Sequence, residues 1–131
     1  MSLTRATQTN NIVSARSYYD IMFRTSTSGV IKTVEMDFPP GTYVGAALLV
    51  EAIGIGPGKI SHSGTTATGQ TITYTVDNAV NIPAFTKIRI QLANINNPPE
   101  PSNSLTVSIT TKNSAGNIID GPTPTMTYSM K

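Results

Sequence analysis

Residues 71–76 read TITYTV, in which a threonine hydroxyl alternates with an apolar side chain along the whole stretch. Successive side chains of a β-strand point to opposite faces, so this period of two predicts a strand with its threonines toward solvent and its apolar residues toward a core. Residues 87–92 (KIRIQL) and 105–111 (LTVSITT) repeat the pattern. The chain is therefore expected to be built from half-buried strands.

A β-hairpin is predicted in the first third of the chain. Residues 18–24 and 30–38 both have strand character, and Ser28-Gly29 lies between them. Two such runs joined by a turn that contains glycine favour a hairpin. In the second run, the expected core face carries Val30, Val34, Met36 and Phe38, and the expected outer face carries Ile31, Thr33, Glu35 and Asp37.

Residues 43–53 allow two interpretations. The run AALLVE at 46–51 could form a short helix on intrinsic propensity. A buried strand is favoured, because glycines bracket the run closely and its surroundings have strand character. Further short strands are expected at 60–62 and 126–130, with a loop at 63–70.

Seven or eight short strands separated by turn signals predict an all-β, two-layer antiparallel sandwich, since each sheet must bury one apolar face. Residues 14–131 are expected to form this single domain. Residues 1–13 show no periodicity and are expected to be an N-terminal arm or linker. Met1-Ser2-Leu3 resembles a start added for recombinant expression.

The composition restricts the chemistry. The chain has 131 residues, no Cys and one His, which excludes disulfides, cysteine-based metal sites and a multi-histidine zinc site. Thr, Ser and Asn supply roughly a third of the residues, which suits a solvent-facing β-protein. The net charge is +2, but the cations form no run, so no nucleic-acid partner is expected. No apolar stretch is long enough for a membrane span.

Several segments together resemble a known family. They are the turn Ser28-Gly29, FPPG at 38–41, GIGPG at 54–58, IPAFT at 82–86, NINNP at 94–98 and GNIIDGP at 116–122. In this order they look like the immunoglobulin-like β-sandwich domains of secreted surface proteins of archaea, particularly ammonia-oxidising types, and of some bacteria. Phe85-Thr86 departs from the Gly-Thr turn that is more usual there. The resemblance implies a non-enzymatic domain outside the cytoplasm, at the cell surface or secreted. Because Met1-Ser2-Leu3 looks like an added start, a natural leader peptide is expected to be missing from this sequence.

Three carboxylates are candidates for a calcium site: Glu35, Asp37 and Asp120. Glu35 and Asp37 lie two residues apart on one strand, so their side chains share a face about 7 Å apart. Calcium prefers several oxygen ligands, and Asp120 is the most plausible additional one. The alternative interpretation of Glu35 and Asp37 is a charged outer face that discourages edge pairing.

Other motifs favour structural roles. Asn113–Asn117 predicts a hairpin turn in which Asn113 caps and Gly116 takes a positive φ. Residues 54–59 (GIGPGK) depart from a phosphate-binding loop and favour a tight connection. His62 is expected on an exposed loop or edge strand. Tyr18 and Tyr19 must face opposite ways on one strand, so one of them is expected to be exposed and is a candidate interface or ligand residue.

The function expected from these observations is a structural or adhesive domain that associates with other surface proteins or with itself. The alternative is a calcium- or carbohydrate-binding module of a larger secreted protein. A viral structural protein and a hydrolase are weaker alternatives.

Overall fold

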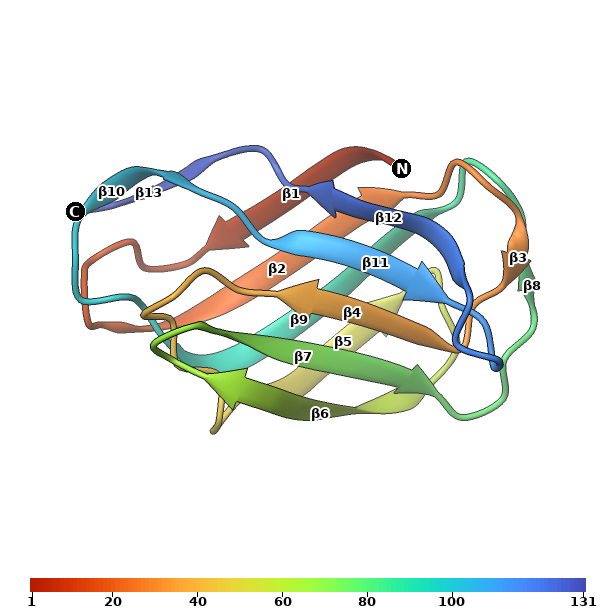
Figure 1. Cartoon of the computed structure of the whole chain (residues 1–131), viewed down its shortest axis with the longest axis horizontal. Coiled ribbons are helices and arrows are strands. Elements are labelled where there is room, and N and C mark those ends of the chain that lie inside the picture. The colour runs from red at the N-terminus through yellow and green to blue at the C-terminus, as the bar shows by residue number, and fades with distance from the viewer.

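The computed structural model describes residues 1–131 and contains no helix. Two large antiparallel sheets stack face to face (Figure 1). The first sheet has the order β1-β2-β9-β5 and the second sheet has the order β12-β11-β4-β7-β6. Their strands are β1 (Ser2–Gln8), β2 (Arg16–Arg24), β9 (Lys87–Asn96), β5 (Leu48–Ile53), β12 (Ile118–Pro124), β11 (Ser108–Lys112), β4 (Thr33–Asp37), β7 (Gly69–Val76) and β6 (Gly58–Thr65).

Two short ribbons complete the fold. β3 (Gly29–Val30) pairs with β8 (Asn81–Ile82) at one end, and β10 (Ser102–Leu105) pairs with β13 (Tyr128–Met130) elsewhere. The all-β antiparallel sandwich is therefore confirmed, with more strands in its two large sheets than the seven or eight predicted. No helix in the chain is long and apolar enough to cross a membrane.

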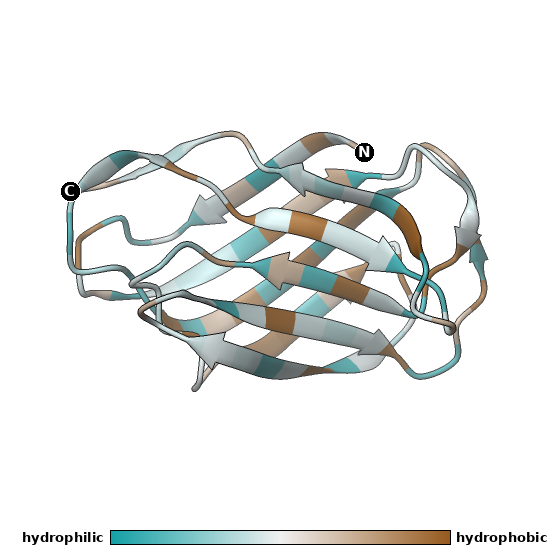
Figure 2. Cartoon of the chain, viewed as in Figure 1, coloured by the Kyte–Doolittle hydropathy of each residue, from teal (hydrophilic) through white to brown (hydrophobic).

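The predicted alternation produces the core. Along β7, every second residue is buried, and Figure 2 shows the same banding of apolar and polar residues on several strands. A cluster of 21 buried residues fills the space between the sheets. Each fully buried Ile or Phe contributes about 1.5–3 kcal/mol relative to an exposed one, so this layer holds the two sheets together.

The predicted hairpin between residues 18–24 and 30–38 is wrong. β2 lies between β1 and β9 in the first sheet, whereas β4 lies between β11 and β7 in the second. The second run breaks at Ile31-Lys32, where the chain crosses from one sheet to the other. The Lys32 amide donates to the Lys112 carbonyl at 2.8 Å, which starts the pairing of β4 with β11.

This break also changes which side chains of residues 30–38 point toward the core. Ile31 is buried in the core and Val30 is 42% exposed, the reverse of the prediction, whereas Val34, Met36 and Phe38 are buried as predicted. The alternation is interrupted where the ribbon strand β3 ends and β4 begins.

Residues 1–13 do not form a free arm. β1 pairs antiparallel with β2, and the Thr4 hydroxyl donates to the Pro124 carbonyl at 3.0 Å. The Met126 amide donates to the Thr4 carbonyl at 2.9 Å. The prediction failed because the inward residues of β1 are Thr4 and Ala6, which are buried but give little apolar signal.

Residues 43–53 contain a strand rather than a helix, but this strand is not buried. β5 is an edge strand of the first sheet, and Leu48, Val50 and Ile53 are among its exposed side chains. Only Leu49 and Ala52 pack partly against the core. The predicted loop at 63–70 is also shorter than expected, because β6 extends to Thr65 and forms a hairpin with β7.

Candidate functional site

The paired strands β3 and β8 lie at one end of the sandwich (Figure 1). An open hollow of about 420 Å³ lies at this end and is lined in part by Asn81 and Ile82 of β8. Its floor is apolar, since Ile31, Val76 and Ile82 are almost completely buried. The connection between β5 and β6 forms one wall, and residues 80–83 together with Thr86 form the other. Ligand sites in proteins are commonly concave and largely apolar, so this hollow is the first candidate.

The wall between β5 and β6 is held by backbone geometry and by hydrogen bonds, one of which the Asp77 amide donates to the Pro57 carbonyl at 2.9 Å. Gly54 has a φ of +80°, and a Cβ there would lie 2.1 Å from the Lys87 carbonyl oxygen, so a side chain cannot be accommodated. The Tyr74 hydroxyl donates to the Gly56 carbonyl at 2.5 Å. Burial raises the pKa of Tyr74, and the charge of Asp77 raises it further. The wall is therefore fixed to the second sheet.

Two large exposed apolar side chains lie in this region: Val80 lines the hollow, whereas Phe85 lies in the chain between the lining residues Pro83 and Thr86 without lining the hollow itself. Val80 is 65% exposed and Phe85 is 67% exposed. Phe85 also has a φ of +65°, in the left-handed region that costs a non-glycine residue roughly 1–2 kcal/mol. A residue that is both strained and exposed contributes little to folding, and such strain is concentrated at functional positions.

The connection that carries Phe85 is fastened by Thr25, which is fully buried. The Thr25 hydroxyl donates to the Pro83 carbonyl at 2.9 Å and accepts from the Thr86 amide at 2.9 Å. The Phe85 amide donates to the Thr25 carbonyl at 2.7 Å. Phe85 is thus presented on a rigid turn, and the Arg24 guanidinium lies 5.3 Å from the centre of its ring.

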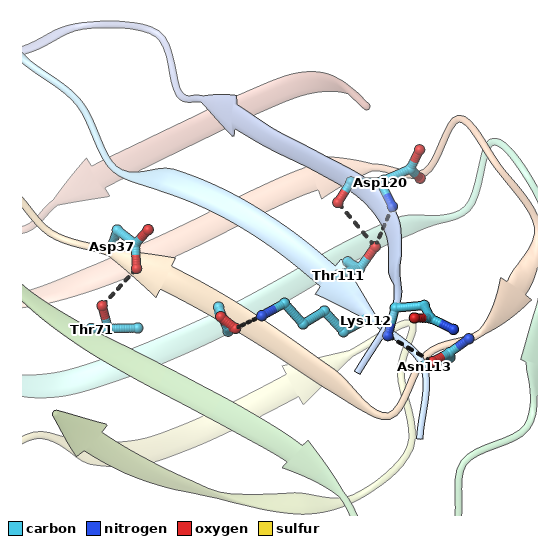
Figure 3. A network of polar contacts seen from close by, with 8 residues as sticks. Asp37, Thr71, Thr111, Lys112, Asn113 and Asp120 are labelled. Carbon is cyan, nitrogen blue, oxygen red and sulfur yellow. Dashed lines mark hydrogen bonds and ion pairs between the residues drawn. The ribbon is translucent and has the colours of Figure 1, made fainter. Parts of the chain in front are cut away.

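The three calcium candidates do not come together. Glu35 binds Lys112 at 2.8 Å, and Asp37 accepts a hydrogen bond from the Thr71 hydroxyl at 2.6 Å (Figure 3). The structure contains no group of three or more His, Cys, Asp or Glu side chains that could hold a metal ion. The alternative role of discouraging edge pairing does not apply either, because β4 is an inner strand.

Asp120 holds a loop in place through hydrogen bonds. Its carboxylate accepts from the amides of Ser26 and Thr27 at 3.1 and 3.2 Å, while its own amide donates to the Thr111 hydroxyl at 3.0 Å (Figure 3). Asp120 is buried, so these bonds satisfy a carboxylate that water scarcely reaches. The carboxylate therefore fixes the connection between β2 and β3, beside Thr25.

Tyr18 and Tyr19 face opposite ways, as predicted. Tyr19 is fully buried, and its hydroxyl donates to Asn97 Oδ1 at 2.7 Å, so Tyr19 is wrong as an interface candidate. Tyr18 is 55% exposed and lies between two shallow hollows on the outer face of the first sheet. The larger hollow has Leu48 and Ala93 beside the amides of Asn10 and Asn94.

The remaining motifs have the expected structural roles. Residues 54–57 connect β5 to β6, and His62 is exposed on β6 at the edge of the second sheet. Asn113 Oδ1 accepts from the amides of Ala115 and Asn117, both at 3.0 Å, and Gly116 has a φ of +82°. The turn between β11 and β12 is therefore as predicted.

Phe85 and Val80 were not singled out as functional residues from the sequence. One signal was available for Phe85, since it occupies a turn position where glycine is more usual. Val80 lies in an irregular segment, and nothing in the local pattern marks it as exposed.

Comparisons with known proteins identify the fold. No protein-family profile matches the chain, and no curated protein matches it either. The solved structure of an uncharacterized protein from Nocardia farcinica with an immunoglobulin-like fold covers 98% of this chain and 99% of its own, with 14% identity and a TM-score of 0.62. A cohesin module from a Clostridium perfringens family 33 glycoside hydrolase covers 99% and 98%, with 12% identity and a TM-score of 0.44. The likeness to the Nocardia protein shows that this sandwich is immunoglobulin-like.

Proposed function

We propose that this protein is a non-enzymatic interaction domain that binds another polypeptide at the loop end of its sandwich. The apolar hollow would receive a side chain of the partner, and Phe85 and Val80 would pack against the segment that carries it. Interfaces of this kind depend on a few well-packed anchors, and aromatic residues are prominent among them.

The observation that supports this proposal best is the combination of strain and exposure at Phe85. A glycine would adopt a φ of +65° without steric cost, and a polar residue would suit a position that is 67% exposed. The buried Thr25 nevertheless holds the turn in place with several hydrogen bonds. A rigid, exposed aromatic side chain loses little conformational freedom on binding, which favours affinity.

The test is a selection of displayed random peptides on the wild-type domain, followed by binding measurements on Phe85→Gly. Met126→Ala is the matched control, because Met126 is 65% exposed like Phe85 but lies in the connection between β12 and β13, outside the turn that carries Phe85. We expect enriched peptides that bind the wild type and Met126→Ala equally and lose at least about tenfold in affinity on Phe85→Gly, the size of a 1.4 kcal/mol contact. Absence of enrichment, or equal binding to Phe85→Gly, would overturn the proposal.

The setting that we propose is the cell surface or the secreted fraction, where the partner is another surface protein. The outer face of the second sheet supports this setting, because β4, β6 and β7 place Thr33, Ser61, Ser63, Thr71, Thr73 and Thr75 in register on it. Fractionation of the native cells with an antibody to the domain tests the setting, and a purely cytoplasmic signal would contradict it.

A second candidate function is carbohydrate binding at Tyr18. Sugar rings stack on exposed aromatic faces, and amides and hydroxyls beside Tyr18 (Asn10, Asn94 and Thr9) could bond to sugar hydroxyls. A glycan array compared between the wild type, Tyr18→Ala and the control Tyr43→Ala tests it. Glycan binding that disappears only in Tyr18→Ala would favour this function over peptide binding.

A further inference from the structure

Three cations converge beside Phe85 on the outer face of the first sheet. Arg24 ends β2, Lys87 begins β9 directly opposite it, and Arg5 lies on β1 opposite Met22. We call Arg5, Arg24 and Lys87 the cationic rim. Directly opposed residues of antiparallel strands have Cα atoms only about 4.5–5.5 Å apart, so Arg24 and Lys87 are immediate neighbours. Arg5 is diagonal to Arg24 on the neighbouring strand, a relation that usually corresponds to about 7–8 Å.

None of the three cations has a carboxylate partner. The chain contains two ion pairs, Arg89 with Asp20 and Lys112 with Glu35, and neither involves the rim. Asp20 is occupied by Arg89, whose pKa is raised by its hydrogen bond and charge interaction with Asp20 and also by Glu51. Asp20 is therefore engaged by Arg89, and Glu51 lies opposite Gln91, four residues along β9 from Lys87.

The other side of the hollow does not repeat this charge. Asp77 is exposed there, and the Lys32 ammonium donates to the Val76 carbonyl at 2.5 Å. The cation beside Val76 is therefore bonded to a backbone carbonyl and lies near an exposed carboxylate, whereas Arg24 and Lys87 face each other beside Phe85 without a carboxylate.

The facing of Arg24 and Lys87 is unfavourable for folding, although Arg24 Nε also donates a hydrogen bond to the Phe85 carbonyl at 3.2 Å. Like charges directly opposite each other on paired strands are destabilising, and Arg24 faces Lys87 in this way. The one favourable contact of Arg24 with an aromatic group is to Phe85, the residue already strained by its φ. The facing cations and the strained φ of Phe85 are both explained if one partner binds to the cations and to the Phe85 ring.

We infer that the polypeptide bound at the hollow is acidic, with carboxylates flanking its apolar anchor. This inference rests on the proposed function and names the chemistry of the partner. The planar guanidinium of Arg24 can bind a carboxylate through two parallel hydrogen bonds, and Lys87 adds a point charge beside it. A nucleic acid is a poorer fit, because three cations neutralise few phosphates and the adjoining hollow is apolar.

The test uses three synthetic peptides that share one apolar centre taken from the displayed selection and differ in flanks of Glu, Gln or Lys. Their binding is measured by fluorescence anisotropy at low and high salt. We expect the order Glu, then Gln, then Lys, with the preference for Glu over Lys of about tenfold or more at low salt and weaker at high salt.

Two charge variants locate the effect. Arg24→Gln combined with Lys87→Gln is expected to remove the preference for acidic flanks, whereas Arg16→Gln combined with Lys59→Gln removes the same charge away from the cationic rim and is expected to keep most of it. All four side chains are exposed, so both variants are expected to fold, and circular dichroism verifies this.

The outcomes separate this inference from the function on which it rests. Equal binding of the three peptides, lost in Phe85→Gly, would overturn the acidic partner and leave the peptide-binding site intact. Failure of all three to bind would overturn both. A single-stranded oligonucleotide that binds the cationic rim more tightly than the acidic peptide would overturn the inference in favour of a nucleic acid.

Discussion

Replacing Phe85 by glycine should leave the fold almost unchanged in stability. Releasing the strain at a φ of +65° is worth roughly 1–2 kcal/mol. The flexibility of glycine in the unfolded chain costs about 0.5–1 kcal/mol. Loss of the exposed contact between Arg24 and the ring costs about 0.5–1 kcal/mol more. These terms nearly cancel, so the free energy of unfolding is expected to change by less than about 1 kcal/mol.

Two comparison variants make this prediction specific. Phe85→Ala keeps the strained φ and loses the ring, so it should be less stable than Phe85→Gly. Phe23→Ala removes a fully buried ring and should cost about 3–5 kcal/mol. Urea unfolding followed by circular dichroism, with linear extrapolation to water, measures all three. If Phe85→Gly loses more than about 2 kcal/mol, Phe85 stabilises the fold, and its exposure is no argument for binding.

Three further predictions concern the rest of the molecule. Tyr19→Phe leaves Asn97 Oδ1 without its buried donor and should lower the free energy of unfolding in urea by about 1–3 kcal/mol. Tyr18→Phe, at an exposed position, should lower it by under about 0.5 kcal/mol. Equal losses would refute the assigned roles. Burial raises the pKa of Tyr19, with a smaller contribution from Tyr128, and burial also raises the pKa of Tyr128. Both phenols stay neutral in the folded state while the unfolded chain ionises near pH 10, so their stabilisation is complete below about pH 10 and falls by about 1.4 kcal/mol per phenol per pH unit above it. Urea unfolding across this range measures the slope, and a stability that does not change there would contradict the burial. Leu48 is exposed on the edge strand β5, so Leu48→Lys should reduce aggregation at high protein concentration, as measured by light scattering. The free energy of unfolding should change by less than about 0.5 kcal/mol. Unchanged aggregation would exclude this edge as the aggregating surface.

Local patterns predicted individual elements well. The alternation in 71–76 became β7, and the turn at Asn113–Asn117 formed as its residues suggest. Both depend on neighbouring residues, because side-chain period and turn conformation are properties of a short stretch of backbone. Where a local pattern was weak, as in β1, the strand was missed.

Local sequence patterns did not predict most of the candidate site. Arg5, Arg24 and Lys87 are far apart in the chain and gave no cluster in the sequence, yet the pairing of β1, β2 and β9 places them together. The carboxylates Glu35 and Asp120, by contrast, were grouped as possible calcium ligands and are engaged with different partners. Side-chain type is readable from the sequence, but proximity depends on which strands pair.

The sequence by itself determined that this protein is an all-β sandwich, because alternating side chains oblige each strand to bury one face whatever its neighbours are. Only the tertiary structure decided which strands are neighbours, and therefore that a hollow, a strained Phe85 and three unpaired cations share one end. The physical reason is that the packing of the whole core selects which strands pair across long sequence separations. Crossings between the sheets, such as the one at Ile31-Lys32, also decide this pairing. Neither the core packing nor the crossings can be recognised in a short stretch of sequence.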